Sequence, residues 1–470
     1  MPVAHTTEPA PVIEHPGEDL SNDIRRRLAA VEPLALRTFT PSLAVLAKSA
    51  GSYHWTPEGR KLADFTAGVL VMNLGHNPTR WWHRVMHYLG LGAINAKDEF
   101  GEAVTLNAYN AVTEIEVTCS ERLVELMQAQ PGGARCEQVL WAASGSEAIQ
   151  KALWAALAHG AASGPRDLIL STRHGFHGKK GLAGAVTGCE TDKDRDPRVR
   201  FISFPREECL NVAAQRQPLD LAPYEAELNT LWKQHGSRIC ALITEPYLGG
   251  GGSFHPQKEY LQLLERFCRK HDIIFILDEV QANFGRTGEL FAFTEYGVEP
   301  DIVALGKGLG NGVAVSAAVG RTDIFAQLHY GEASDTWSAN PLACAAVLAT
   351  LDEYERTDVI GQAARLSQVI ERGLLRLGEL PIVAHIRGEG VVWGIECAGV
   401  GRAPADAVAQ ALVEACYLGD EQGRAIHLLG PLAGKVIRVS PPLVMPCEEA
   451  QEYLDAMYGI FASVGDRLRS

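Results

Sequence analysis

Short apolar runs alternate with helical patterns from about residue 135 to residue 320. Seven runs rich in Ile, Val and Leu lie at 137–143, 166–172, 198–204, 238–244, 272–278, 301–306 and 312–320. Continuous apolar runs of this length are typical of strands that are buried on both faces of a sheet. Helical patterns lie between several of them. The alternation predicts an α/β fold with a mostly parallel sheet and helices on both faces.

The C-terminal part of the chain has a different pattern. Residues 341–378 predict two or more helices, and shorter strands with helices follow them, so we expect a second, smaller α+β lobe. The turn and strand pattern at 51–70 indicates an N-terminal segment that joins this lobe. The predicted division is a disordered tail over 1–20, an N-terminal segment over 21–72, a large domain over 73–350 and a small domain over 351–470.

Composition narrows the function classes. The formal charge of −14 disfavours nucleic acid and anionic membranes as partners, since both attract basic proteins. The ten cysteines form no Cys-x-x-Cys pair, and no apolar run approaches the ~18 residues that a membrane span needs. The first residues have no basic and apolar signal-peptide pattern. We therefore expect a soluble cytoplasmic protein.

Chemically useful residues follow five of the predicted strands. They are Ser144–Glu147 after the first run, Phe176 after the second, Glu245 after the fourth, Asp278 with Val280 and Gln281 at the end of the fifth, and Lys307 after the sixth. In doubly wound sheets, ligands bind beyond the carboxyl ends of the strands. The sequence thus predicts a phosphate-sized nest, an aromatic ring, carboxylates and a lysine along one rim.

Each of these residues also has an ordinary structural interpretation. Ser144 with Glu147 has the spacing of a helix capping box, although Gly145 and Ser146 at a helix N-terminus would also favour a phosphate. Phe176 could stack on a planar ring or pack in a core. The neighbouring pair His174 and His177 lacks a third ligand, so no metal site is predicted.

The combination of Lys307 and Asp278 favours a more specific interpretation of the predicted site. A desolvated lysine has a lowered pKa and can act as a nucleophilic amine that forms a Schiff base. A carboxylate at the end of an apolar run needs a partner, such as a protonated ring nitrogen, an arginine or a helix N-terminus. Together with the aromatic ring and the phosphate nest, these residues describe a site for pyridoxal 5′-phosphate (PLP).

At these residues the sequence resembles the class III (ω-amino acid) aminotransferases, a fold type I PLP family, over roughly residues 45–465. The resemblance rests on eight segments in family order: residues 51–78, "SGSEA" (144–148), "HGFHG" (174–178), "TEP" (244–246), "LDEVQANFGRTG" (277–288), "ALGKGLGNG" (304–312), "NPLACAA" (340–346) and "IRVSPPLVM" (437–445). It implies a homodimer with shared active sites, an amine donor and a keto-acid acceptor.

The resemblance also implies roles for individual residues. Lys307 matches the Schiff-base lysine and Asp278 the aspartate on the pyridine nitrogen. The matches in the cofactor site are Gly145 and Ser146 for the phosphate, Phe176 and Val280 for the two ring faces, Gln281 near the phenolic oxygen, and Thr336 for the phosphate of the neighbouring subunit. Glu245 is also predicted to bind the cofactor. Arg438 matches an arginine that often holds a substrate carboxylate; its ordinary interpretation is a surface strand arginine.

Two departures from the family pattern concern specificity. Gly250 stands where some members carry a glutamate that pairs with this arginine, and "SANP" replaces the usual glycine pair before Asn340. The predicted activity is transfer of an amino group from an amino acid or ω-amine to an α-keto acid such as pyruvate, glyoxylate or 2-oxoglutarate. The alternatives are another PLP reaction (decarboxylase, aminomutase or amine phospho-lyase) and a cofactor-binding protein without turnover.

Overall fold

The computed structural model describes residues 12–95, 97–192 and 195–469. Its centre is a seven-stranded sheet in the order β4-β10-β9-β8-β7-β5-β6. The strands are β4 (Gln138–Ala142), β5 (Leu168–Thr172), β6 (Val199–Ile202), β7 (Ile239–Thr244), β8 (Ile274–Asp278), β9 (Ile302–Leu305) and β10 (Ser316–Gly320). β10 pairs with both of its neighbours, β4 and β9, in antiparallel fashion, while β9, β8, β7, β5 and β6 pair with one another in parallel. The prediction of a mostly parallel sheet is confirmed.

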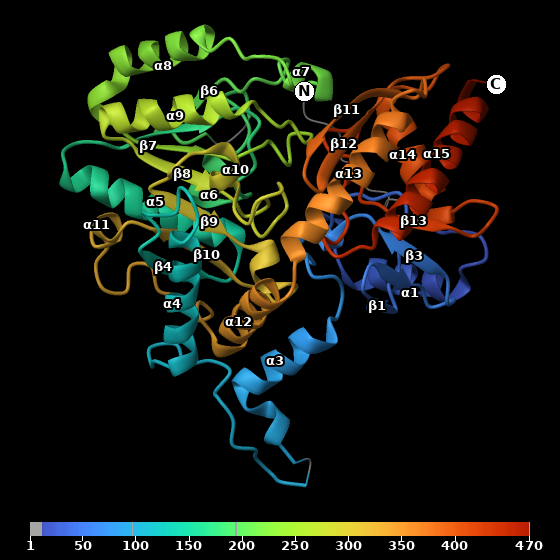
Figure 1. The fold of residues 1–470 in the computed structure, drawn as a ribbon, viewed down its shortest axis with the longest axis horizontal. Helices are drawn as coiled ribbons and strands as arrows, with labels where there is room; N and C mark the ends of the chain where they lie inside the picture. Colours follow the sequence, from blue (N-terminus) through green and yellow to red (C-terminus); the bar gives the residue numbers. More distant parts are fainter. Residues whose placement is uncertain (1–11, 96, 193–194, 470) are drawn as a thin grey trace.

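Alternate residues of each strand enter different cores, because side chains point to opposite faces of a sheet. Ile274 and Ile276 of β8 pack in the cluster that contains the helix α5 (Gly145–Ala162). Phe275 and Leu277 pack in the cluster that contains α9 (Lys258–His271). The continuous apolar runs of the sequence therefore correspond to strands that are covered by helices on both sides (Figure 1).

The remaining helices surround this sheet and build the second lobe. The α-helices are α1 (Asp19–Val31), α2 (Ala67–Leu70), α3 (Thr79–Leu89), α4 (Glu114–Gln128), α6 (Gly181–Ala185), α7 (Val212–Gln215), α8 (Ala222–His235), α10 (Ala292–Tyr296), α11 (Thr322–Phe325), α12 (Pro341–Arg356), α13 (Val359–Leu377), α14 (Ala405–Leu418) and α15 (Cys447–Arg469). The 3-10 helices are η1 (Leu34–Leu36), η2 (Leu91–Ala93), η3 (Gly236–Arg238) and η4 (Lys307–Gly310). None of the described helices is both long and apolar enough to cross a membrane.

The second lobe joins the two ends of the chain. A four-stranded sheet contains β1 (Lys48–Ala50), β2 (Tyr53–Trp55), β3 (Lys61–Asp64) and β13 (Ala425–His427). β13 pairs with β3 in parallel, so the N-terminal and C-terminal segments lie side by side (Figure 1). A three-stranded sheet contains β11 (Val383–Glu389), β12 (Val392–Cys397) and β14 (Val436–Val439). This arrangement agrees with the expected small lobe, while the four domain boundaries stay predictions.

The predicted disordered tail over 1–20 needs a correction. Residues 1–11 lie outside the described residues, but His15 and Glu18 are buried and the helix α1 begins at Asp19. Glu18 is buried, and its Oε2 accepts hydrogen bonds from Arg25 Nη2 at 2.8 Å and from Tyr417 Oη at 2.9 Å. The Pro-rich and acidic composition suggested disorder. Local sequence does not reveal the contact with Tyr417 on α14, because this partner is distant in the chain.

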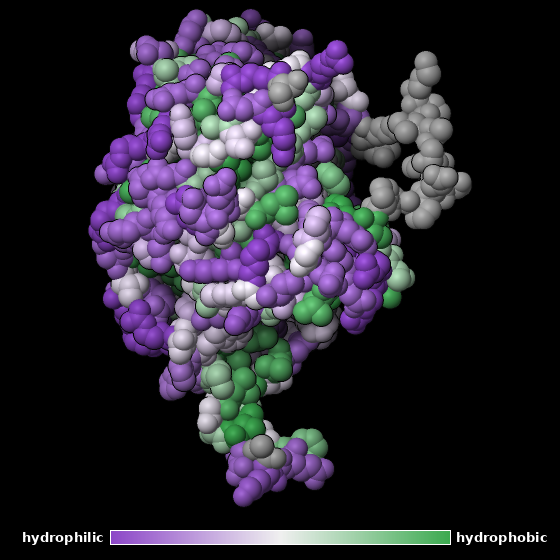
Figure 2. All heavy atoms as spheres, turned by 90° about the vertical axis from the view of Figure 1, so that its right-hand side faces the viewer, coloured by the Kyte–Doolittle hydropathy of each residue, from purple (hydrophilic) through white to green (hydrophobic). Residues whose placement is uncertain are grey.

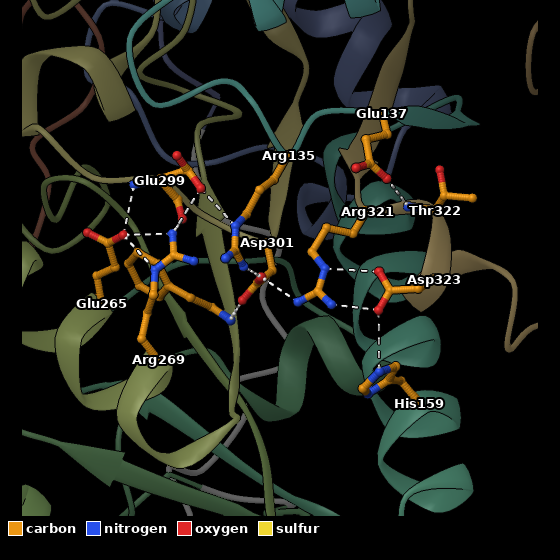
Figure 3. Close-up of polar contacts among 11 residues, drawn as sticks. Arg135, Glu137, His159, Glu265, Arg269, Glu299, Asp301, Arg321, Thr322 and Asp323 are labelled. Carbon is orange, nitrogen blue, oxygen red and sulfur yellow. Dashed lines mark hydrogen bonds and ion pairs between the residues drawn. The ribbon is translucent and has the colours of Figure 1, made fainter.

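The rim at the amino ends of the parallel strands is closed by ion pairs (Figure 3). Asp301 is buried directly before β9, and its carboxylate pairs with Arg135 and with Arg321, the latter at 2.9 Å. Its Oδ2 also accepts a hydrogen bond from Phe275 N at 2.9 Å. The charged residues at the amino ends of the strands therefore stabilise the fold. A site for chemistry is expected at the opposite, carboxyl ends.

Candidate active site

A cavity of about 520 Å³ lies at the carboxyl ends of the central strands. Nine of the predicted site residues line it: Gly145, Ser146, Phe176, Glu245, Asp278, Val280, Gln281, Lys307 and Arg438. They come from segments that follow β4, β5, β7, β8 and β9, and from β14 of the second lobe. The site therefore lies where the two lobes meet.

The pairing of β8 with β9 brings the acid and the lysine to the same rim. Asp278, the last residue of β8, lies opposite Ala304 in the parallel register. β9 ends at Leu305, and Lys307 follows after one glycine. Two residues that are 29 positions apart in sequence thus line one cavity because parallel neighbours end at the same edge.

Asp278 is buried and has two hydrogen-bond partners. Its Oδ2 lies 2.7 Å from His177 Nδ1, and its Oδ1 accepts a hydrogen bond from Val280 N at 3.0 Å. The His177 side chain is fully buried, and its Nε2 has no hydrogen-bond partner among the described residues. The imidazole fixes the orientation of a carboxylate whose burial would otherwise be costly.

The backbone around Lys307 is constrained by close packing. A Cβ atom on Gly306 would lie 2.6 Å from Ser316 Oγ and 3.2 Å from Val280 Cγ1, so only glycine fits there. Lys307 itself has a φ of 46°, a left-handed conformation that is uncommon for a residue with a side chain. Burial lowers the pKa of the Lys307 amine, and the negative charge of Asp278 partly opposes this shift. A larger neutral fraction makes the amine a better nucleophile.

The start of α5 combines both interpretations of the "SGSEA" segment. Ser144 is the N-cap, and its side chain accepts a hydrogen bond from Glu147 N. The next two residues, Gly145 and Ser146, line the cavity at the positive end of the helix. A Cβ on Gly145 would lie 2.8 Å from Val280 Cγ1. The capping residue Ser144 is therefore followed directly by the two residues that face the anion site. The first of these, position 145, requires a glycine.

Glu245 holds the loop that carries the aromatic ring. Its Oε2 accepts a hydrogen bond from Phe176 N at 2.8 Å, and its Oε1 accepts one from Gly249 N at 3.2 Å. Burial raises the pKa of Glu245 to about 7, and the nearby charge of Asp278 acts in the same direction. Phe176 is 46% exposed at the mouth of the cavity. A large aromatic ring with this exposure has a free face for a planar ligand.

Arg438 and Gln281 provide polar atoms for which the described residues offer no partner. Arg438 Nε and Gln281 Oε1 are buried without a hydrogen bond. Burial also lowers the pKa of the Arg438 guanidinium. Buried polar groups normally have partners, so these atoms indicate a polar ligand. The ordinary interpretation of Arg438 as a surface arginine is wrong, since the residue is only 5% exposed.

These observations fit PLP. The cavity offers an oriented carboxylate for a ring nitrogen, a lysine for an aldehyde, an aromatic ring for stacking, and a helix N-terminus for a phosphate. The glycines at 145 and 306 keep open the space around Val280 that a ring needs.

Thr336 does not line the cavity of this chain. It is exposed in the segment between α11 and α12. The neighbouring Asp335 ties this segment to α5, since Lys151 Nζ lies 2.7 Å from its Oδ2. A role for Thr336 across a subunit interface is compatible with its exposure and stays a prediction.

Four residues that line the cavity were not singled out as site residues in the sequence: Thr38, His177, Lys179 and Leu432. Val69 also lines the cavity. The only role that the sequence raises for His177 is metal binding with His174. Its position directly after Phe176 in "HGFHG" is the signal that could have placed it in the site. Tyr53 is not among the residues that line the cavity, and it packs against Tyr453 of α15 with ring centroids 6.1 Å apart.

Gly250 lies against the aromatic ring. A Cβ at this position would be 2.9 Å from Phe176 Cβ. Such a distance is shorter than carbon atoms tolerate, so a glutamate here requires Phe176 or the loop to move. The absence of a glutamate at position 250 therefore allows Phe176 to occupy its observed position.

Comparisons with known proteins find matches over most of the chain. The family model "Aminotransferase class-III" matches residues 37–461. The chain is 29% identical over 453 residues to an omega-aminotransferase of Caulobacter vibrioides, covering 91% of this chain and 95% of that protein. It is 30% identical over 432 residues to an acetylornithine aminotransferase of Agrobacterium fabrum, with 91% and 96% covered. A structure of ornithine aminotransferase from Toxoplasma gondii, which holds PLP at partial occupancy, is similar in fold, with a TM-score of 0.78, 22% identity and 97% of both chains covered.

Proposed function

Since the chain belongs to the class III aminotransferases and is a PLP-dependent enzyme, we propose that it transfers an amino group from a carboxylate-bearing amino acid or ω-amine to a small α-keto acid. The observation that carries this proposal is the buried Arg438, whose Nε has no partner, in the same cavity as Lys307 and Asp278. The positive charge of Arg438 would attract the carboxylates of pyruvate, glyoxylate and 2-oxoglutarate, so we expect these keto acids as acceptors.

Lys307 and Asp278 divide the chemistry between them in this proposal. When bound, PLP supplies a ring that takes up the electrons released as the substrate C–H bond breaks. The Lys307 amine would hold the cofactor through its aldehyde and, once the donor amine has displaced it, would carry the proton that leaves the substrate carbon. The Asp278 carboxylate would accept a hydrogen bond from the ring nitrogen and keep it protonated, while His177 maintains the orientation of this carboxylate.

Arg438 is the residue we assign to the substrate. A guanidinium binds a carboxylate through two parallel hydrogen bonds, which fix both position and orientation. Because Gly250 carries no side chain, no acid at this position competes for the arginine. Both half-reactions would then use the same cation, and the donor and acceptor would each place a carboxylate beside it.

We also assign to the enzyme a homodimer with shared active sites. Large apolar side chains are exposed along an arm that runs from α3 to α4, which Figure 2 shows as hydrophobic surface on the lower projection. The exposed residues are Trp82, Met86, Ile94, Phe100, Leu106, Tyr109, Val112 and Val117. Apolar patches of this extent are typical of protein interfaces. In a dimer with a second copy of this chain, the exposed Thr336 would also be able to bind the cofactor phosphate of the neighbouring subunit.

A substrate panel tests the proposal. The holoenzyme is incubated with α-amino acids, ω-amino acids and simple amines, each with one of the three keto acids, and the products are separated and identified. We expect a new amino acid from the keto acid only when a carboxylate-bearing donor is present. Product formation without a keto acid would instead indicate a decarboxylase, aminomutase or phospho-lyase, and equal rates with simple amines would contradict the role of Arg438.

A further inference from the structure

Three titratable side chains form a buried cluster in the second lobe, apart from the residues that line the active-site cavity. His54 comes from β2, Asp64 ends β3, and His76 follows the turn after α2. Their exposed fractions are 2%, 0% and 7%. One ligand atom from each lies within 4.8 Å of the other two. Two imidazoles and one carboxylate thus converge without contact with bulk water.

The distances within the cluster are close to those of a metal site. Asp64 Oδ2 lies 2.7 Å from His76 Nε2 and 3.6 Å from His54 Nε2. In a tetrahedral zinc site with ligand bonds of 2.0–2.2 Å, neighbouring ligand atoms are about 3.4 Å apart. Small side-chain shifts would therefore convert this cluster into a coordination shell.

The outer contacts of the cluster hold the ligands in place. Asp64 uses its other oxygen, Oδ1, to accept hydrogen bonds from Thr66 N at 2.8 Å and Thr66 Oγ1 at 2.7 Å. His54 Nδ1 lies 2.7 Å from Ser49 Oγ. Metal-binding histidines usually have such a partner on the second ring nitrogen, and metal-binding carboxylates are hydrogen-bonded in the same way.

His427 provides a second, independent indication of a ligand. It lies opposite Asp64 in the register of β13 with β3, and its ring stands edge-on to His54 with centroids 5.3 Å apart. Its Nδ1 is buried and has no hydrogen-bond partner among the described residues. Three imidazoles therefore surround one carboxylate, and one of them has an unsatisfied nitrogen.

We propose that His54, Asp64 and His76, with His427 beside them, bind one divalent transition-metal ion of the zinc type. Nitrogen and oxygen ligands of this kind suit Zn²⁺ and exclude a preference for Ca²⁺ or Mg²⁺, which take oxygen ligands. The ion would fasten β2 and β3 to the turn at His76. It would also hold the start of the segment that carries Val69 into the active-site cavity, so its role is structural.

The test uses the PLP-loaded enzyme, stripped of metals with a chelator and then given Zn²⁺. We expect one zinc ion per chain to remain after gel filtration and the melting temperature to rise. A crystal grown from this sample should show an anomalous scattering peak between His54, Asp64 and His76. No peak there, or a peak only elsewhere in the molecule, would overturn the proposal.

Two variants and a control complete the test. His54→Gln and Asp64→Asn should each lower zinc affinity at least about tenfold, because ligand loss costs no less than loss of an outer partner. His385→Gln, on β11 and outside the cluster, should bind zinc as the unchanged enzyme does. If either cluster variant fails to fold, the anomalous peak of the unchanged enzyme still decides. Equal zinc affinity in all folded variants would show that the cluster is held by hydrogen bonds alone.

Discussion

His177 Nδ1 lies 2.7 Å from Asp278 Oδ2, and both residues are buried and line the active-site cavity. The imidazole comes from the loop after β5 and the carboxylate from the end of β8, so the contact joins two elements of the rim. Asp278 is thereby held in one orientation before any cofactor arrives. This relationship makes His177 a positioning residue for the proposed carboxylate.

Replacement of His177 should therefore weaken cofactor binding. Loss of a hydrogen bond to a charged group costs about 1.5–3 kcal/mol, so His177→Ala should lower PLP affinity by roughly 10- to 100-fold. His177→Asn should restore most of the affinity, because its amide nitrogen can take the place of Nδ1. PLP titration followed by visible absorption measures both. The exposed His174 is the control, and equal affinities in His174→Ala and His177→Ala would contradict the assignment.

Arg438 should determine the preference for carboxylate-bearing donors. In single-turnover experiments without keto acid, Arg438→Gln should weaken binding of such donors by about 1.5–3 kcal/mol, or roughly 10- to 100-fold. Amines without a carboxylate should react unchanged. Lys435→Gln, which removes a half-exposed charge directly before the same strand, is the matched control. A uniform loss for all donors in Arg438→Gln would indicate a role in folding instead.

Glu245 should make the stability of the cofactor-free enzyme depend on pH. Burial raises its pKa from an ordinary value near 4.5 to about 7. Between these values the folded chain keeps a proton that the unfolded chain has lost. The contribution of Glu245 to the free energy of unfolding should therefore fall as pH rises through this window, by at most about 1.4 kcal/mol per pH unit, and then level off above pH 7.

Comparison with Glu245→Gln isolates this contribution. The difference in unfolding free energy between the two proteins, measured with urea at several pH values, should decrease from pH 4.5 to about 7. Glu259→Gln, on the exposed side of α9, controls for removal of one carboxylate. A difference that is constant or increases with pH over this range would refute the raised pKa.

Asp301 should stabilise the fold without affecting the chemistry. Removal of one partner from a buried ion pair costs about 3–5 kcal/mol, since the remaining charges lose their compensation. Asp301→Ala should therefore lower the free energy of unfolding by about 3 kcal/mol or more, because Arg135 and Arg321 both lose a partner. Asp323→Ala, whose carboxylate is 55% exposed on the other side of Arg321, should cost less than about 1 kcal/mol. Equal losses would contradict the importance of burial.

The sequence predicted the central sheet well because its strands are buried on both faces. Each of the seven apolar runs contains a strand of that sheet, and the residues that follow five of them line the cavity or its entrance. Parallel strands end at a common edge, so residues such as Asp278 and Lys307 could be brought together from order alone.

Contacts between distant segments were not predictable in the same way. His177 was recognised as a histidine near the site, but its contact with Asp278 depends on the order of β5, β7 and β8 in the sheet. The packing of Glu18 against Arg25 and Tyr417, and the convergence of the histidines around Asp64, also depend on long-range pairing. No local pattern marks these contacts.

Reduction of the PLP-loaded enzyme with borohydride, followed by digestion and mass spectrometry of the peptides, tests the central claim most directly. Borohydride fixes the bond between the cofactor aldehyde and the amine that holds it. We predict a single modified peptide in which the pyridoxyl group is attached to Lys307, and no modification in Lys307→Ala. Attachment to Lys179 in the same cavity, or to any other lysine, would contradict the account.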